Sequence, residues 1–369
     1  MLYIPAVKLF YAENALTDYD LFLLHGIYSF VIFLIEIPSG YLADVWGRKK
    51  TIAAGMLFGV VGFGVYSLSY GFWGFLLAEI ALGIGQAFVS GSDSAILYDT
   101  LLEQEKTDKY IKFEGSITGT GNLAESLAGL VFTLLAYESM RRYYYIQILI
   151  TSIGLIAAIF LVEPKSHISR VKASVKSVLS VVKGTLWKNP QLSRYIILSS
   201  IIGFASLSMA WFAQIFLYDA GVKKVSFGVV LAALNFMVML GSFSAYRTDK
   251  ILRPRFILIF LLVFLAAGYL LAAQFISFWG LGFLMIFYFV RGTAHPIMKD
   301  RINKYSASNV RATVLSVRSL LIRLLFALLG PMLGWYTDRV SLSFALSLCG
   351  LIILIPGIYL VAAILRRND

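Results

Sequence analysis

The sequence predicts an all-α integral membrane protein of twelve transmembrane helices, built as two six-helix pseudo-repeats. Composition, the lengths of the apolar runs and a weak internal repeat support this fold class. Of the 369 residues, 59% are hydrophobic and 14% are charged, whereas a soluble domain is about 45–50% apolar and about 25% charged. These values argue against a water-soluble enzyme. The aromatic share of 15% and the 8 prolines also exclude a fibrous or disordered chain.

Twelve apolar runs separated by short polar loops define the expected helices. Backbone polar groups in lipid must be paired within the segment, so such runs form helices. They lack the short alternating pattern of a membrane barrel. The predicted domains are a six-helix bundle over 1–163, a cytoplasmic linker over 164–192 and a second bundle over 193–369. The spans are expected near 1–13, 18–43, 51–70, 72–98, 112–137, 141–163, 193–218, 224–246, 253–276, 277–303, 310–337 and 341–365.

An internal repeat relates the two halves. Residues 88–93 read FVSGSD and residues 289–294 read FVRGTA, an offset of 201 that also pairs Gly40 with Gly241. Two six-helix halves are a recognised transporter architecture. The same offset predicts that the first helix is shortened at its N-terminus and lacks its cytoplasmic half. The alternative is a short first helix that thins the bilayer locally.

The positive charges predict the orientation. Of the 32 Lys and Arg residues, 23 fall in loops on one side of the predicted spans and five in loops on the other. Loops rich in Lys and Arg face the cytoplasm, so both termini are expected there, in a bacterial plasma (inner) membrane. Within the linker, Val171, Val175 and Val182 share a stripe flanked by lysines, which indicates a basic amphipathic helix on the inner leaflet. The net charge of +12 is therefore explained by the orientation of the protein in the membrane, and it does not indicate a nucleic-acid partner.

One loop carries a family resemblance. Residues 40–50 read GYLADVWGRKK between the second and third spans. This resembles the loop signature G-x-L-A-D-x-x-G-R-K-x of the major facilitator superfamily (MFS), and the resemblance covers the whole chain. Residues 91–101 and 311–316 resemble a bacterial efflux-permease branch. The signature is matched at Gly40, Leu42, Ala43, Asp44, Gly47, Arg48 and Lys49.

The resemblance implies a cytoplasmic gate. Gly40 is expected to let two helices approach closely, and Gly47 permits a tight turn. Asp44 is expected to face the positive N-terminal end of the eleventh span, and Arg48 to bridge Asp44 and Asp99. The alternative is that the basic residues are ordinary orientation charges. The second half has Ala245 where the acid should be, so the latch is predicted to be one-sided. The predicted gate residues are Gly40, Asp44, Gly47, Arg48, Lys49, Asp99 and Glu36.

Polar residues inside the predicted spans mark the candidate substrate and proton pathway. A charge at mid-bilayer costs about 2.5–3.5 kcal/mol, so it commonly marks function or a buried pair. Asp93 is expected to pair with Arg291 or His295; the alternative is static contact between helices. The predicted pathway residues are Glu79, Gln86, Asp93, Glu125, Arg291, His295 and Arg323.

Two departures from the family pattern bear on coupling. Glu79 stands where many proton-coupled members carry an arginine, and residues 118–129 lack the Gly-Pro of the antiporter signature. Proton coupling would therefore rest on Asp93, Glu125 or Glu79.

The resemblance implies a secondary active transporter that works by alternating access, with proton-coupled export of a small amphipathic organic molecule as the preferred version. A sugar or metabolite facilitator, a lipid flippase and a transporter-like receptor are the alternatives. No enzyme is expected, since HExxH, GxSxG and phosphate-binding motifs are absent. The single Cys349 excludes an internal disulfide and a cysteine-based metal cluster. We expect no cofactor or metal, and a monomer whose partners are its substrate, protons and the lipid bilayer.

Overall fold

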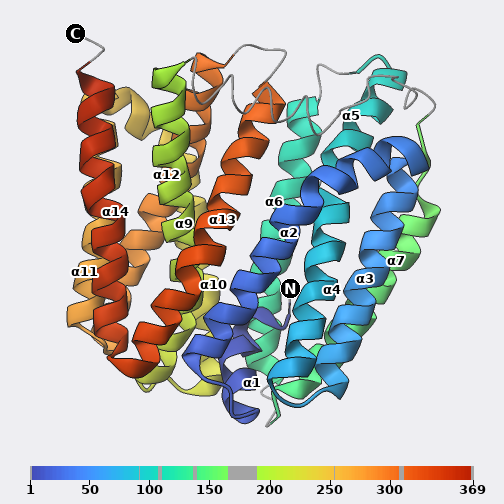
Figure 1. The fold of residues 1–369 in the computed structure, drawn as a ribbon, viewed down its shortest axis with the longest axis horizontal. Helices are drawn as coiled ribbons and strands as arrows, with labels where there is room; N and C mark the ends of the chain where they lie inside the picture. The colour runs from blue at the N-terminus through green and yellow to red at the C-terminus, as the bar shows by residue number, and fades with distance from the viewer. Residues whose placement is uncertain are drawn as a thin grey trace. The chain divides into compact units, whose positions relative to one another are not determined.

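The structure is a computed structural model, and its regular elements in the described ranges are all helices (Figure 1). It divides into two compact units. Unit 1 comprises Met1–Leu16 and Leu24–Val175, and unit 2 comprises Thr17–Leu23 and Lys176–Asp369. The described residues are 2–90, 92–106, 110–135, 139–164, 189–252, 254–306 and 311–366.

The helix bounds follow the predicted spans in most places. The first half of the chain contains η1 (Ile4–Ala6), α1 (Val7–Glu13), α2 (Asp18–Trp46), α3 (Arg48–Leu68), α4 (Phe72–Ser90), α5 (Asp93–Glu103), α6 (Tyr110–Leu135) and α7 (Arg141–Phe160). The second half contains α9 (Pro190–Asp219), η4 (Lys224–Ser226), α10 (Phe227–Ile251), α11 (Pro254–Gln274), η5 (Phe278–Gly280), α12 (Leu281–Tyr305), α13 (Arg311–Arg339) and α14 (Leu342–Leu365).

Ten helices in the described ranges are long and apolar enough to cross a membrane, which confirms the predicted fold class. Two predicted spans are not among them. Helix α1 has only seven residues, and the apolar part of α6 is the short stretch Leu123–Leu135. The predicted amphipathic helix of the linker lies in 165–188, outside the described residues.

The fourth predicted span agrees with one apolar stretch of spanning length, Phe72–Glu103. Within this stretch, α4 is described as far as Ser90 and α5 from Asp93. Residue 91 lies outside the described residues.

Close backbone approach defines the packing of unit 1. Helix α3 lies beside α4 and α7 (Figure 1). A Cβ added to Gly55 would lie 2.7 Å from the carbonyl oxygen of Gly85, and one added to Gly85 would lie 2.7 Å from that of Gly55. Small residues allow such contact between membrane helices.

Arg141, at the start of α7, ties three segments of unit 1 together. Its guanidinium donates to the carbonyl oxygens of Tyr66, Ser67 and Ser69 at 3.2, 2.8 and 2.8 Å, at the C-terminal end of α3. It also donates to Asn14 Oδ1, just after α1, at 2.8 Å. A cation at this position satisfies carbonyls that lack helical partners and complements the helix dipole.

Unit 2 is built on two tightly packed helix pairs, α10 with α12 and α11 with α14 (Figure 1). A Cβ on Gly241 would lie 2.0 Å from the carbonyl oxygen of Phe289, and one on Gly292 would lie 2.1 Å from that of Val238. Any larger residue would therefore separate α10 from α12. Helix α9 contacts α12, α13 and α14 and contributes many buried side chains.

The first residues of α2 belong to unit 2, where Asp338 of α13 caps them. The Asp338 carboxylate accepts the backbone N–H groups of Asp18 and Tyr19 at 3.1 and 2.7 Å. A carboxylate at a helix N-terminus satisfies unpaired donors and the positive end of the helix dipole.

Candidate functional site

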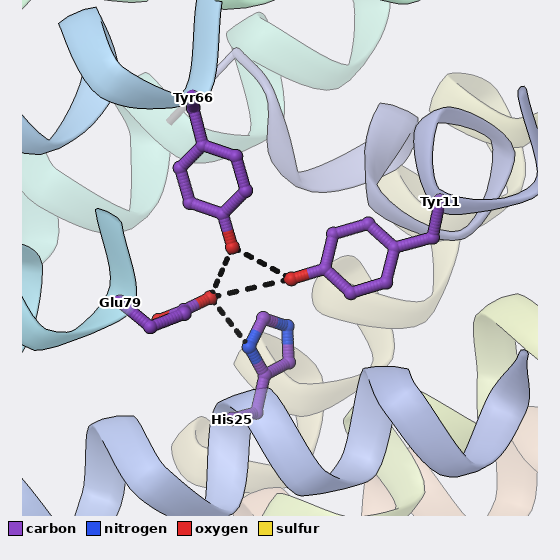
Figure 2. A network of polar contacts seen from close by, with 4 residues as sticks. All are labelled: Tyr11, His25, Tyr66 and Glu79. Carbon is purple, nitrogen blue, oxygen red and sulfur yellow. Dashed lines mark hydrogen bonds and ion pairs between the residues drawn. The ribbon is translucent and has the colours of Figure 1, made fainter. Parts of the chain in front are cut away.

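The most polar feature buried in unit 1 surrounds Glu79 of α4. The residue is 3% exposed, although it lies within an apolar helix. Its Oε1 atom accepts a hydrogen bond from the Tyr66 hydroxyl at 2.6 Å and lies 2.8 Å from Nδ1 of His25. The Tyr11 hydroxyl is 3.5 Å from the same oxygen and 2.6 Å from the Tyr66 hydroxyl. Figure 2 shows these four side chains converging from α1, α2, α3 and α4.

Aromatic rings isolate this network from water. The Phe75 ring lies 5.5 Å from the Tyr11 ring and 5.0 Å from the Tyr66 ring, measured between centroids. The Tyr144 ring lies 5.1 Å from that of Tyr66 and 4.2 Å from that of Phe10. Apart from the tyrosine hydroxyl groups, the rings around Glu79 offer few polar atoms that could stabilise a charge.

The site is therefore suited to holding a proton. An unpaired carboxylate in such surroundings costs several kcal/mol or more, so the carboxyl is either paired with a cation or protonated. The contact between His25 and Glu79 allows either state. A protonated imidazole can pair with the Glu79 carboxylate, or a neutral imidazole can lie beside a protonated carboxyl. The Tyr66 hydroxyl donates to the charged carboxylate and stabilises that state.

Of these residues only Glu79 was a predicted pathway residue. His25, Tyr11 and Tyr66 were missed. A titratable imidazole within the apolar second span was an available signal for His25, by the same rule that selected His295. The two tyrosines gave no such signal, because tyrosines are common in membrane proteins.

A second polar cluster lies at the predicted cytoplasmic end of unit 1. Nη1 of Arg48 lies 2.7 Å from Oδ2 of Asp99, and both side chains are largely buried. This is the ion pair that the sequence predicts. Gly47 has a φ of +100°, a left-handed value that favours glycine at the turn. The carboxylate of Glu163, which the sequence did not single out, accepts the backbone N–H groups of Arg48 and Lys49 at 2.8 and 2.7 Å.

Other predicted gate contacts differ or fall outside the described residues. No described atom lies within 4 Å of a Cβ built on Gly40, so the close approach expected there is found instead at its repeat counterpart, Gly241. The side chain of Asp44 is outside the described part of the chain, as are residues 307–310 before α13. Glu36 lies half-buried in α2, where its carbonyl accepts the Ser39 hydroxyl at 2.9 Å.

The second half has an ion pair near the corresponding positions. The repeat offset of 201 relates Arg48 to Asp249 and Asp99 to Asp300. Asp249 of α10 forms an ion pair with Arg301 of α12, one residue beyond Asp300. The sequence comparison missed this pair because it considered only the acid expected at Ala245.

The other predicted pathway residues in unit 1 do not join the Glu79 network. Asp93 starts α5 and its side chain is exposed, beyond the end of α4. Its expected place on one helix face with Glu79 and Gln86 stays a prediction, because residue 91 between the two helices lies outside the described residues. Gln86 is half-buried on α4, and Glu125 is exposed on α6.

The predicted pathway residues in unit 2 lie on α12 and α13. Arg291 is half-buried with its guanidinium carbon 5.2 Å from the centre of the Tyr288 ring, and His295 is exposed one turn further along. Arg323 is half-buried, and its Nε has no hydrogen-bond partner among the described residues. Asp93 belongs to the other unit, so its pairing with Arg291 or His295 stays a prediction.

Ten apolar helices of spanning length in the described part of the chain define a multi-pass membrane protein. A family model described as the Major Facilitator Superfamily matches residues 1–331. The chain belongs to this superfamily. The recognition made from the loop motif is thereby confirmed.

Two similar proteins also have names that describe them as membrane transporters. The chain is 22% identical over 244 residues to an uncharacterized MFS-type transporter of Methanocaldococcus jannaschii, covering 64% of this chain and 60% of that protein. It is 31% identical over 160 residues to the inner membrane transport protein YajR of Escherichia coli, covering 42% of this chain and 34% of that protein. The chain thus matches less than two thirds of the length of each.

Solved structures show the same fold across nearly the whole chain. A mutant of the nucleoside transporter NupG superposes with a TM-score of 0.81 at 14% identity, covering 99% of this chain and 95% of that one. The D-xylose-proton symporter superposes with a TM-score of 0.77 at 12% identity, covering 97% and 93%. At these identities the likeness shows the fold alone. Within the described residues, no group of His, Cys, Asp and Glu is arranged to hold a metal ion.

Proposed function

We propose that this protein is a proton-coupled secondary active transporter that works by alternating access and exports a small organic molecule. The observation that carries the proposal is the buried contact of Glu79 with His25 and Tyr66, at 2.8 and 2.6 Å. Glu79 is the residue that binds and releases the coupling proton. His25 and Tyr66 stabilise its charged state.

The coupling follows from the electrostatics of the network. Protonation of Glu79 removes the charge that attracts His25 and accepts the Tyr66 hydrogen bond, so it weakens contacts joining α2, α3 and α4. A rearrangement of helices driven by this loss would link proton occupancy to the direction in which the substrate site opens. A proton-coupled relative of the same fold, the D-xylose-proton symporter, agrees with this mode of action.

The gate is part of the same proposal. The Arg48–Asp99 pair and the Glu163 cap hold the start of α3 and the helix α5 together. We assign this end of unit 1 to the cytoplasm, with both termini on that side of a bacterial inner membrane and the protein acting as a monomer. Asp44 and Lys49 complete the gate.

Reconstituted transport tests the proposal. A compound library is screened for thermal stabilisation of the purified protein, and a radiolabelled hit is followed in proteoliposomes with and without an imposed pH gradient at zero membrane potential. Accumulation above equilibrium that requires the gradient supports coupling. Glu79→Gln should abolish this accumulation, whereas Glu103→Gln, which alters an exposed carboxylate at the end of α5, should preserve it.

The same assay separates the alternatives. A facilitator would equilibrate the compound at the same rate with or without the gradient. A receptor that does not transport would bind the compound and move none of it. Accumulation in response to a gradient of the opposite sign would contradict export.

A further inference from the structure

Unit 2 has a positively charged helix face. Arg291, His295 and Lys299 of α12 are spaced four residues apart, so they share one face of that helix. Arg318 of α13 lies within electrostatic range of His295, as do Arg291 and Lys299. The four basic side chains from two helices therefore form one cluster, which we call the basic face.

Two residues of the basic face are left exposed by the packing of unit 2. Other positions of α12 are buried, with Gly292 and Thr293 against α10. His295 and Lys299, by contrast, are exposed. Arg318 is held in place because its Nε donates to Oγ of Ser199, on α9, at 2.5 Å.

Acidic residues are scarce in the main segment of unit 2. Residues 190–366 contain sixteen Lys or Arg, no Glu and only four Asp, whereas residues 2–164 contain fifteen acidic residues. The four Asp are committed elsewhere. Asp249 pairs with Arg301, and Asp300 Oδ2 lies 2.7 Å from Lys304 Nζ. Asp338 caps α2, and Asp219 lies at the far end of α9.

The preference of Lys and Arg for cytoplasmic loops does not explain this cluster, because part of it lies deep within a membrane-spanning helix. Arg291 lies about 15 Å along α12 from its first residue, near the middle of a membrane-spanning helix. Charged groups at that depth face water or a bound polar partner and not lipid, because lipid exposure costs several kcal/mol. Lys299 and Arg318 lie nearer the helix ends that we assign to the cytoplasm. The basic face therefore extends from that end to mid-depth and would draw an anion inward.

We propose that the basic face is an anion-binding site and that the transported substrate is a small organic anion bearing a carboxylate or phosphate group. The identification of this anion as the transported molecule rests on the proposed transport function. Arg291 and Arg318 supply the planar guanidinium groups that suit carboxylate and phosphate oxygens. This site shares no residue with the network around Glu79 in unit 1.

Charged thiol reagents test the site directly. The only native cysteine, Cys349, is buried, so the unmodified chain provides the blank. In a His295→Cys variant, reaction rates are measured with an anionic sulfonate methanethiosulfonate and a cationic trimethylammonium methanethiosulfonate. The rate with the anionic reagent is divided by the rate with the cationic reagent, and this ratio is then divided by the same ratio for a free thiol in solution. Three nearby cations should raise this normalised ratio about tenfold or more.

Second substitutions show which charges are responsible. Arg318→Gln should lower the ratio several-fold, and Arg318→Lys should restore it. Lys304→Gln should leave it unchanged, because Lys304 is already paired with Asp300. A ratio equal to that of the free thiol, a ratio insensitive to Arg318→Gln, or a thiol that reacts with neither reagent would overturn the proposal.

A matched pair of small probes tests the substrate class. Benzoate should slow labelling of the same thiol by a neutral maleimide, and benzyl alcohol at equal concentration should not. If benzoate protects no better than the alcohol, the assignment of an anionic substrate fails. These labelling experiments are done without a pH gradient and measure no transport, so a failure of proton coupling and a failure of anion binding give different results.

Discussion

The hydrogen bond from Tyr66 to Glu79 gives a quantitative prediction about stability. Replacing Tyr66 with Phe removes a donor 2.6 Å from a carboxylate oxygen. A hydrogen bond to a charged group contributes about 1.5–3 kcal/mol. Because Glu79 is buried and loses this donor, the free energy of unfolding of Tyr66→Phe should fall by about 1.5–3 kcal/mol.

Denaturant unfolding in detergent measures this change. Tyr11→Phe is the matched control, because the Tyr11 hydroxyl lies 3.5 Å from the carboxylate and 2.6 Å from the Tyr66 hydroxyl. The control should lose only the roughly 0.5–1.5 kcal/mol of a neutral hydrogen bond. An unchanged free energy of unfolding in Tyr66→Phe, or a larger loss in Tyr11→Phe, would refute the reasoning.

Three predictions concern the scaffold, and thermal or denaturant unfolding in detergent checks each. Arg141→Ala should destabilise the protein by about 2–3 kcal/mol, because charge-assisted bonds to the end of α3 are lost; a change near zero would contradict this role. Gly292→Ala should cost about 1–3 kcal/mol by overpacking against α10, whereas Gly282→Ala, which has open space around it, should cost almost nothing. A double-mutant cycle on Arg48 and Asp99 should give a coupling energy of about 1–3 kcal/mol, and additive effects would show that the pair contributes nothing.

The sequence predicted most of the fold because membrane helices are specified locally. Length, hydropathy and the charges of short loops suffice to place a spanning helix, and ten of the predicted spans have that length.

The candidate site was predicted only in part because its residues meet through tertiary packing. Glu79 was selected as a charge inside an apolar helix, a property visible in the sequence alone. Its contacts with His25, 54 positions earlier, and with Tyr11, 68 positions earlier, depend on how α1, α2 and α4 pack. The Asp249–Arg301 pair was missed for a different reason, since Arg301 lies one residue beyond the position that the repeat offset gives for Asp99.

The central claim is that Glu79 couples proton movement to transport, and exchange transport in Glu79→Gln tests it most directly. In proteoliposomes loaded with unlabelled compound, the variant should still exchange labelled for unlabelled compound, because exchange does not require net proton movement. Its exchange rate should no longer depend on pH, and it should build no gradient when a pH difference is imposed. If Glu79→Gln still accumulates the compound in response to that pH difference, Glu79 is not the coupling residue.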